Sequence, residues 1–188
     1  QENTFYIESG SENLRYSGHV QNFGNTAEVK NNQILGTIGK GLRMEAVKIY
    51  LTDASINGEK GGIQYRTHVQ NEGWQSFKSN GQMAGTQGKS LRMEAVKIRL
   101  TGEISKCYDV YYRTHVQNFG WMGWAKNGES AGSEGYAYRM EAIQIMLLPK
   151  TKGAPGSTGN SFKKKAVVVN ATKTLSVALG FDGTKIIT

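Results

Sequence analysis

The motif HVQN decides the fold. It occurs at residues 19–22, 68–71 and 115–118, and a glycine follows its asparagine two positions later each time. A second motif, RMEA, opens at residues 43, 92 and 139. Successive copies of both motifs begin 49 and then 47 residues apart, so whole units are repeated rather than isolated motifs. We place the three units at about residues 5–52, 53–101 and 102–148.

The pattern within each unit predicts β-strands. Between Ile63 and Asn71, apolar or β-branched residues fall at every second position, which is typical of a strand with one buried face. Polar residues of HVQN and its neighbours occupy the other face. The Asn-Gly pairs at 80–81 and 127–128 predict hairpin turns.

The last strand of each unit carries an irregularity. In LRMEAVKIRL (91–100), the apolar residues alternate up to Ala95 and then shift by one position, which predicts a β-bulge at Ala95–Val96. The same shift follows Ala46 and Ala142. Several residues of this segment are helix formers, but it is short and has no capping residue before it, which favours a strand.

Three units of three or four strands are each too small to bury a core alone, so they should close around a pseudo-threefold axis. We therefore predict an all-β fold that is β-prism-like, with a β-trefoil as the alternative. Residues 1–148 should form one binding domain. Residues 149–188 should form a Gly/Ser/Pro-containing linker and a basic, β-rich extension, or the start of a further domain.

Charge is distributed unevenly. The chain carries a net charge of +8, but seven lysines and one aspartate lie after residue 148, which leaves +2 for the first 148 residues. The basic character therefore does not predict a nucleic-acid partner. No apolar run is long enough for a membrane-spanning helix, and QENTFYIESG at the start lacks the pattern of a signal peptide, so we expect neither. The single cysteine excludes an internal disulfide.

Tryptophan marks the candidate binding units. Trp74 and Trp121 follow the conserved glycine in the second and third units, and Asn25 occupies that position in the first. An exposed indole could stack on a sugar ring, with polar neighbours bonding to hydroxyl groups. The alternative is a core tryptophan, although replacing one by asparagine would leave a cavity and a buried amide unless Phe23 fills the gap. Trp124 is interpreted as packing.

The predicted ligand-binding residues surround these two indoles. They are Trp74, Trp121, Arg66, Arg113, His68, His115, Gln70 and Gln117. A metal site formed by the HVQN histidines is a weaker alternative, because no carboxylate or cysteine accompanies them in a ligand pattern. We expect each histidine to bond to the glutamate of RMEA in its own unit, and the arginine and glutamate of RMEA to form a structural ion pair. We predict no metal and no cofactor.

Enzymatic activity is not predicted. The sequence contains no GxSxG, HExxH or phosphate-binding glycine loop. A glycosidase needs two carboxylates, but the acidic residue shared by all three units is a single glutamate beside an arginine.

The segment YRTHVQNEGWQSFKSNGQMAGTQGKSLRMEAVKIRL closely resembles the clostridial hydrophobic repeat, which is named for its Gly-Trp dipeptide. The first unit departs from it at Asn25 and at Ile34-Leu35. The resemblance implies a secreted or cell-surface protein of a Gram-positive anaerobe with a role in binding macromolecules. We predict a non-catalytic, lectin-like module that binds polysaccharide or cell-wall glycan. One alternative is an adhesion or assembly module that forms homo-oligomers through residues 163–188. A lectin domain of a membrane-acting toxin is the weaker alternative, since membrane association is not expected.

Overall fold

The computed structural model describes residues 12–167, which are almost entirely β-structure. The first unit contributes β1 (Leu14–Val20), β2 (Gly24–Asn25), β3 (Val29–Lys30), β4 (Ile34–Gly36) and β5 (Met44–Leu51), followed by the short β6 (Ser55–Ile56). The second contributes β7 (Glu59–Val69), β8 (Gly73–Trp74), β9 (Lys78–Ser79), β10 (Ala84–Gly85) and β11 (Met93–Gly102), and then the short helix α2 (Ile104–Cys107). The third contributes β12 (Tyr108–Val116), β13 (Gly120–Trp121), β14 (Ala125–Lys126), β15 (Ala131–Glu134) and β16 (Met140–Pro149). A 3-10 turn (Lys150–Lys152) and β17 (Phe162–Lys164) complete the described chain.

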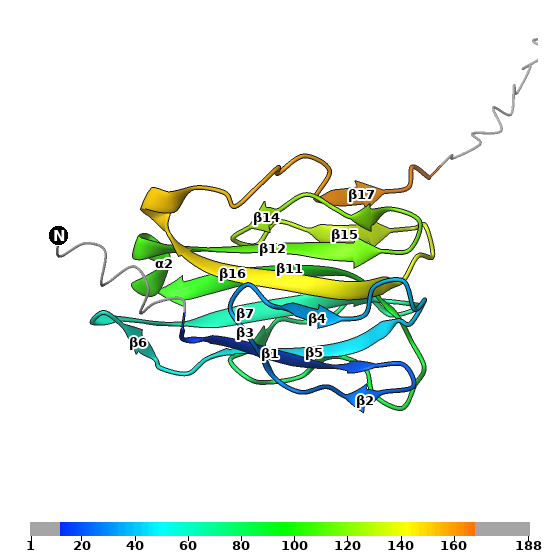
Figure 1. The fold of residues 1–188 in the computed structure, drawn as a ribbon, viewed down its shortest axis with the longest axis horizontal. Helices are drawn as coiled ribbons and strands as arrows, with labels where there is room; N and C mark the ends of the chain where they lie inside the picture. Colours follow the sequence, from blue (N-terminus) through cyan, green and yellow to red (C-terminus); the bar gives the residue numbers. More distant parts are fainter. Residues whose placement is uncertain (1–11, 168–188) are drawn as a thin grey trace, which may run out of the picture.

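Each unit is built on one pair of long antiparallel strands. The pairs are β1 with β5, β7 with β11, and β12 with β16. Figure 1 shows these long strands lying along the long axis of the molecule. The first strand of each pair also carries the two short strands that follow it, such as β8 and β9 on β7. The all-β prediction is therefore confirmed.

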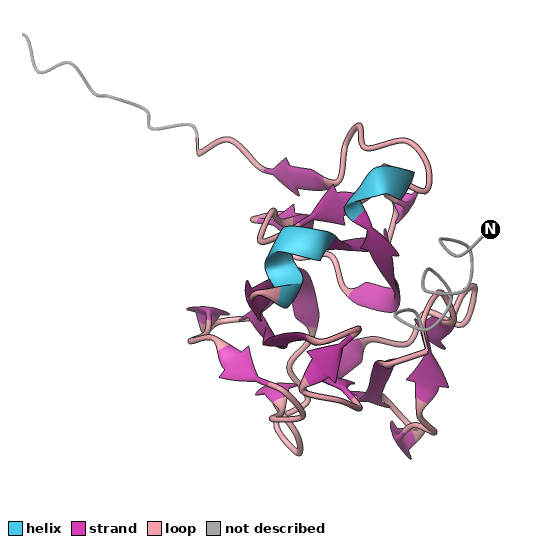
Figure 2. Cartoon of the chain, turned by 90° about the vertical axis from the view of Figure 1, so that its left-hand side faces the viewer, coloured by secondary structure: helices cyan, strands magenta, loops and turns pink. Residues whose placement is uncertain are grey.

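The units are joined by a cyclic exchange of their fourth strands. β10 of the second unit pairs with β5 of the first, and β15 of the third pairs with β11 of the second. β4 of the first unit closes the ring on β16 of the third. The result is three sheets that each contain strands from two units, and the end-on view shows them around a common centre (Figure 2).

This exchange corrects the hairpin prediction for the Asn-Gly pairs. The strands that flank Asn80-Gly81, β9 and β10, do not pair with each other, because they lie in different sheets. The backbone N–H of Gly81 instead donates to the carbonyl of Ile49 in the first unit (2.8 Å), and the carboxamide oxygen of Asn80 accepts from the N–H of Leu51 (2.9 Å). Asn-Gly here marks a turn that carries the chain from one sheet to the next.

The HVQN motif is repeated because its turn needs a particular backbone shape. The asparagines (Asn22, Asn71 and Asn118) have φ of 67°, 64° and 64°, and the glycines that follow (Gly24, Gly73 and Gly120) have φ of 72°, 74° and 69°. Asparagine and glycine are the residues that adopt this left-handed region most readily. The glutamine N–H of each motif donates to the carbonyl of the RMEA arginine at 3.0 Å. Turn geometry therefore accounts for the asparagine and the glycine in all three copies.

The core follows the predicted alternation. Ile63, Tyr65, Thr67 and Val69 are all buried, with equivalent residues of the other units beside them. The buried tyrosine hydroxyls of Tyr16, Tyr65 and Tyr112 donate to the carbonyl oxygens of Gln33, Gln82 and Glu129 in the turns before the exchanged strands. Burial raises the pKa of all three phenols, so they remain neutral donors.

The predicted β-bulge is present but lies one residue earlier than Ala95–Val96. Met93 pairs with Val69 and Ala95 pairs with His68, so Glu94 is the extra residue. The registers of the other two units skip Glu45 and Glu141 in the same way. The correction has a physical consequence, because the bulge turns a glutamate inward: Glu94 is only 5% exposed.

The C-terminal segment docks on the repeats. β17 pairs in parallel with β15, with Phe162 opposite Gly132, and forms the edge of that sheet (Figure 1). Before it, the carbonyl of Ser157 accepts from the N–H of Trp124 at 2.9 Å. The described part of the predicted oligomerisation segment therefore contacts its own chain, whereas residues 168–188 lie outside the described residues.

Candidate functional site

A polar layer lies beneath the candidate site in every unit. Nδ1 of His19, His68 and His115 is 2.9, 3.0 and 3.0 Å from the glutamate of RMEA in the same unit. The RMEA arginine binds that glutamate from the other side, at 2.6, 2.8 and 2.8 Å. The expected histidine–glutamate contact and the structural ion pair are thus confirmed.

In the second unit the buried glutamate of this layer is held ionised. Burial alone would raise the pKa of Glu94, but hydrogen bonds from His68 and Arg92 outweigh it and place the pKa below its ordinary value. No group of three or more histidine, cysteine or acidic residues that could hold a metal occurs in residues 12–167. Each glutamate of the layer is thus paired with a histidine on one side and an arginine on the other.

The second unit stacks an arginine between two aromatic rings. The guanidinium of Arg66 lies 5.3 Å from the centre of the Trp74 ring and 4.8 Å from that of Phe77. Arg99 lies on Phe77 at 4.0 Å, and Lys97 lies on Trp74 at 5.1 Å. Cations and aromatic rings thus alternate along the outer face of this unit, an arrangement favoured by cation–π attraction.

The third unit repeats the arrangement with a second tryptophan. Arg113 lies 4.6 Å from the Trp121 ring and 4.8 Å from the Trp124 ring, and its Nε donates to the carboxamide oxygen of Gln144 at 2.8 Å. Gln144 in turn donates to Asn32 of the first unit at 2.8 Å. We call Arg66 with Trp74 and Phe77, and Arg113 with Trp121 and Trp124, the two arginine stacks.

Trp74 and Trp121 lie between the two alternatives that the sequence leaves open. Both are half-buried, and neither belongs to the hydrophobic core cluster. His68 and His115 meet them edge to face, at 5.4 and 5.5 Å between ring centres. Trp74 also donates from Nε1 to Glu134 of the third unit at 3.3 Å. These indoles are outer-surface residues that neighbouring side chains hold in place.

A groove opens beside the third-unit stack. It has a volume of about 700 Å³ and lies between the outer face of the unit and the C-terminal segment. Trp121, Trp124 and Phe119 supply aromatic walls, and Arg113 and Lys163 are the charged residues that line it. Polar groups come from Asn32, Gln144, Ser157 and Asn160. No carboxylate of the described chain lines this groove.

The first unit has neither stack nor groove. The three stack positions hold Ser17, Asn25 and Glu28, and Asn25 accepts a hydrogen bond from Gln87 of the second unit at 2.6 Å. A pocket of about 150 Å³ remains there, with Met83 in its lining. Phe23 does not fill the gap: it is 58% exposed and lies under Lys40 at 5.2 Å.

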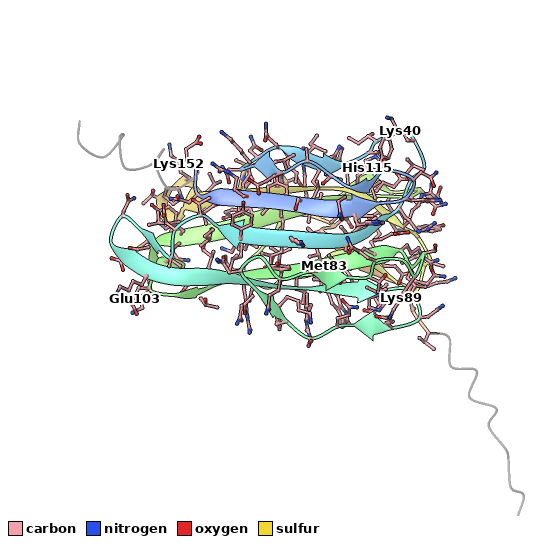
Figure 3. All side chains as sticks on the ribbon, turned by 90° about the horizontal axis from the view of Figure 1, so that it is seen from below. Lys40, Met83, Lys89, Glu103, His115 and Lys152 are labelled. Atoms are coloured by element: carbon pink, nitrogen blue, oxygen red, sulfur yellow. The ribbon has the colours of Figure 1, made fainter. Side chains whose placement is uncertain are left out.

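The domain has two distinct ends along its long axis. Figure 3 labels Lys40, Lys89 and His115 toward one end, and Glu103 and Lys152 at the other. At the first end, each unit joins two of its turns by a different kind of contact. These are a cation–π contact of Phe23 with Lys40, an ion pair of Glu72 with Lys89 (3.0 Å), and an aromatic contact of Phe119 with Tyr136 (5.1 Å). These contacts hold the HVQN turns against the loops before RMEA.

The structure brings some of the predicted ligand-binding residues together and leaves others apart. Arg66 and Trp74 come together, as do Arg113 and Trp121. By contrast, His115 and Gln117 do not line the groove. Gln70 and Gln117 lie beyond the strands, where their backbone bonds to the RMEA arginines.

Several residues that complete the site were not identified from the sequence. They are Phe77, Lys97, Arg99, Gln144 and the C-terminal groove residues. A signal was available for Phe77 and Trp124, because the only unit without the tryptophan also lacks an aromatic residue at that equivalent position. Trp124 is 6% exposed, which agrees with its interpretation as a packing residue.

The comparisons with known proteins agree with the repeat pattern. The family model described as Clostridial hydrophobic W matches residues 19–53, 68–102 and 115–149, one match in each unit. The curated proteins and the solved structures contain no match to this chain. Within residues 12–167, none of the helices is long and apolar enough to cross a membrane.

Proposed function

The chain belongs to the Clostridial hydrophobic W family, and we propose that it is a secreted or cell-surface, non-catalytic module that binds carbohydrate through its second and third units. The cell-wall polymers or other polysaccharides at a bacterial surface would be its ligands. The first unit would close the ring of sheets without contributing to the binding surface.

The groove of the third unit carries this proposal. Its volume of about 700 Å³ lies within the range of roughly 300–1,000 Å³ that is usual for ligand sites. Trp121 is half-buried in the lining of the groove, and the exposed part of its indole would meet the C–H face of a sugar. Asn160 and Ser157 bring backbone and side-chain polar groups to the same groove.

The second unit offers a more open version of the same surface. Trp74 is also half-buried, with Arg66 and Lys97 against its ring. The C-terminal segment reaches this unit indirectly, since Lys164 pairs with Glu134 at 2.8 Å and Glu134 accepts from Trp74. We therefore expect the third unit to bind most strongly and the second to add avidity along a polymer.

Affinity electrophoresis through gels that contain soluble polysaccharides and wall fragments tests the proposal. We expect Trp121→Asn to weaken retention about tenfold, because loss of one aromatic platform removes roughly 1.4 kcal/mol. Trp74→Asn should have a smaller effect. Phe23→Ala is the matched control, because it removes an exposed aromatic residue from the unit without a stack.

Asparagine is the appropriate replacement because the first unit already carries it at this position. Urea unfolding should show that the variants remain folded. Equal retention of the wild type and both tryptophan variants would exclude a binding role for these indoles. A polymer-independent change in mobility that tracks protein concentration would instead favour the assembly alternative.

A further inference from the structure

We propose that the two arginine stacks recognise negatively charged groups, so that the ligand is an acidic polysaccharide bearing carboxylates or phosphates. This inference rests on the proposed function, because it specifies the ligand class of the same surface.

The three members of each stack are present or absent together. Units two and three have an arginine, a tryptophan and a second aromatic residue, and the first unit has Ser17, Asn25 and Glu28 instead. The three positions lie on the long first strand of the unit and on the segments that pair with it, which brings their side chains together on one face. The polar layer beneath is intact in all three units. The polar layer and the turn therefore form without the stack, and the arginine, the tryptophan and the second aromatic residue vary as one set.

The arginines of the stacks differ from the other arginines in their charge balance. Arg43, Arg92 and Arg139 are each neutralised by a buried glutamate. Arg66 and Arg113 form no ion pair with a carboxylate in residues 12–167. Instead, their positive charge is held against aromatic rings and has no counter-ion among residues 12–167.

Stacking fixes the plane of each guanidinium without using all of its donors. Arg113 donates from Nε to Gln144, which leaves the two terminal amino groups for a ligand in the groove. Nε of Arg66 is buried and has no hydrogen-bond partner. A guanidinium that is held planar and rigid binds a carboxylate or a phosphate through two parallel hydrogen bonds, which a freely rotating lysine does not do as well.

Further positive charge lies beside each stack. Lys163 lines the groove next to Arg113, and no acidic residue of the described chain does so. In the second unit, Lys97 and Arg99 continue the alternation of cations and rings on either side of the stack. An acidic polysaccharide presents both requirements at regular intervals, namely an apolar sugar face for the rings and an anionic group for the cations.

The first 148 residues carry a net charge of only +2, so the repeats as a whole exert little general attraction on polyanions. A general attraction to polyanions would not need the aromatic rings. This distinction separates the proposal from non-specific binding of nucleic acid, which depends mainly on the number of cations.

The test uses a matched pair of polymers: polygalacturonate and the same polymer after its carboxyl groups have been reduced to alcohols. Binding is measured by biolayer interferometry in about 0.15 M salt, a physiological ionic strength. Arg66→Ser and Arg113→Ser copy the residue of the first unit, and Arg15→Ser removes the same charge from a position outside the stacks. Purified teichoic acid distinguishes phosphate from carboxylate as the anionic group.

We expect the wild type to bind at least one of the two acidic polymers about 100-fold more tightly than the reduced polymer, since each charge-assisted contact contributes about tenfold. The double variant Arg66→Ser/Arg113→Ser should lose that difference, and Arg15→Ser should keep it. Preference for teichoic acid over polygalacturonate would assign phosphate, and the reverse would assign carboxylate.

Three results would overturn the inference. Equal binding to the acidic and the reduced polymers, with loss in the tryptophan variants, would remove the acidic specificity and leave the proposed function standing. Absence of binding to any of these polymers and to the wider polysaccharide panel would remove both. Equally tight binding of single-stranded DNA, with the same response to the arginine variants, would show general attraction to polyanions.

Discussion

The first and third units have the same backbone but different outer surfaces. Both place a histidine, a glutamate and an arginine in one buried polar layer, and both use the left-handed Asn-x-Gly turn. Outside that layer, the third unit has an arginine between two indoles beside a groove of about 700 Å³. The first has serine, asparagine and glutamate beside a pocket of about 150 Å³.

The difference separates two kinds of repeated residue. Residues of the polar layer and the turn recur in every unit because each sheet of the ring needs them. Tryptophan and its arginine recur only in the second and third units, which carry the arginine stacks. Comparison of the units therefore separates residues that every copy needs for its backbone from residues that shape the outer surface of particular copies.

The largest expected effect comes from a substitution in the third unit that removes part of the difference between the two units. We expect Trp124→Ala to lower the free energy of unfolding by about 3 kcal/mol, because a buried indole is removed and a cavity remains. The loss should also release the C-terminal segment that bonds to the Trp124 backbone and packs Gly156 against its ring. Urea unfolding and limited proteolysis after residue 150 report the two effects.

Phe77→Ala at the equivalent position of the second unit is the control for Trp124→Ala. No segment covers Phe77, which is only half-buried, so its loss should be about 1 kcal/mol. Equal losses in the two variants would mean that the C-terminal segment adds nothing to the third unit.

An intermediate effect should be common to all units. We expect Glu94→Gln to cost about 2 kcal/mol at pH 7, because it leaves Arg92 and His68 without their buried partner. The pKa of Glu94 is lowered in the folded state, so its stabilisation is present above the ordinary value of 4.5 and is lost as the pH falls through the folded pKa. The free energies of unfolding of the wild type and the variant should therefore become equal at acid pH.

Urea unfolding at pH 7 and at acid pH measures this convergence for Glu94. At pH 7 the equivalent variants of Glu45 and Glu141 should lose a similar free energy, because each leaves an arginine and a histidine without their partner. Glu28→Gln is the control, because Glu28 is an exposed carboxylate in a surface ion pair and should contribute less than about 0.5 kcal/mol. A difference that persists unchanged at acid pH would contradict the role of the ionised glutamate.

The smallest expected effect comes from a substitution that makes the first unit resemble the other two. We expect Asn25→Trp to change the free energy of unfolding by less than about 1 kcal/mol, because the ring can lie over the existing pocket and meet His19 edge to face. It should not create binding, since Ser17 and Glu28 remain. Only the triple variant Ser17→Arg/Asn25→Trp/Glu28→Phe should add a third binding unit, seen as tighter retention on the same polysaccharide gel.

The sequence was sufficient for those parts of the fold that local patterns encode. Alternation along Ile63 to Val69 predicted the buried face, and the shared offset of HVQN and RMEA predicted that His68 and Glu94 meet. The bulge was placed one residue late because a shift in the apolar pattern marks the end of an irregularity rather than the residue that is left unpaired. The burial of Glu94 was not predicted either, because the sequence alone does not distinguish a buried, ion-paired glutamate from an exposed one.

Contacts between units were not predictable in the same way. Asn80-Gly81 encodes a turn, but nothing local indicates that the next strand pairs with a different unit. The packing of the C-terminal segment on Trp124 also depends on a distant partner. For the site, spacing identified Trp121 and Arg113, whereas the groove arises only when the C-terminal segment is in place.

The cyclic exchange of fourth strands also has a consequence for how the protein acquires its structure during synthesis. Tyr16 contacts the carbonyl of Ile145, 129 positions away, and β4 has no partner strand until β16 has been made. Contacts of such long range make folding slow. A nascent chain would therefore hold the first unit incomplete, with an open strand edge exposed to other chains, until the third unit leaves the ribosome. Closure of the ring therefore waits for β16, and the groove of the third unit waits for still later residues, those of the C-terminal segment that form its other wall.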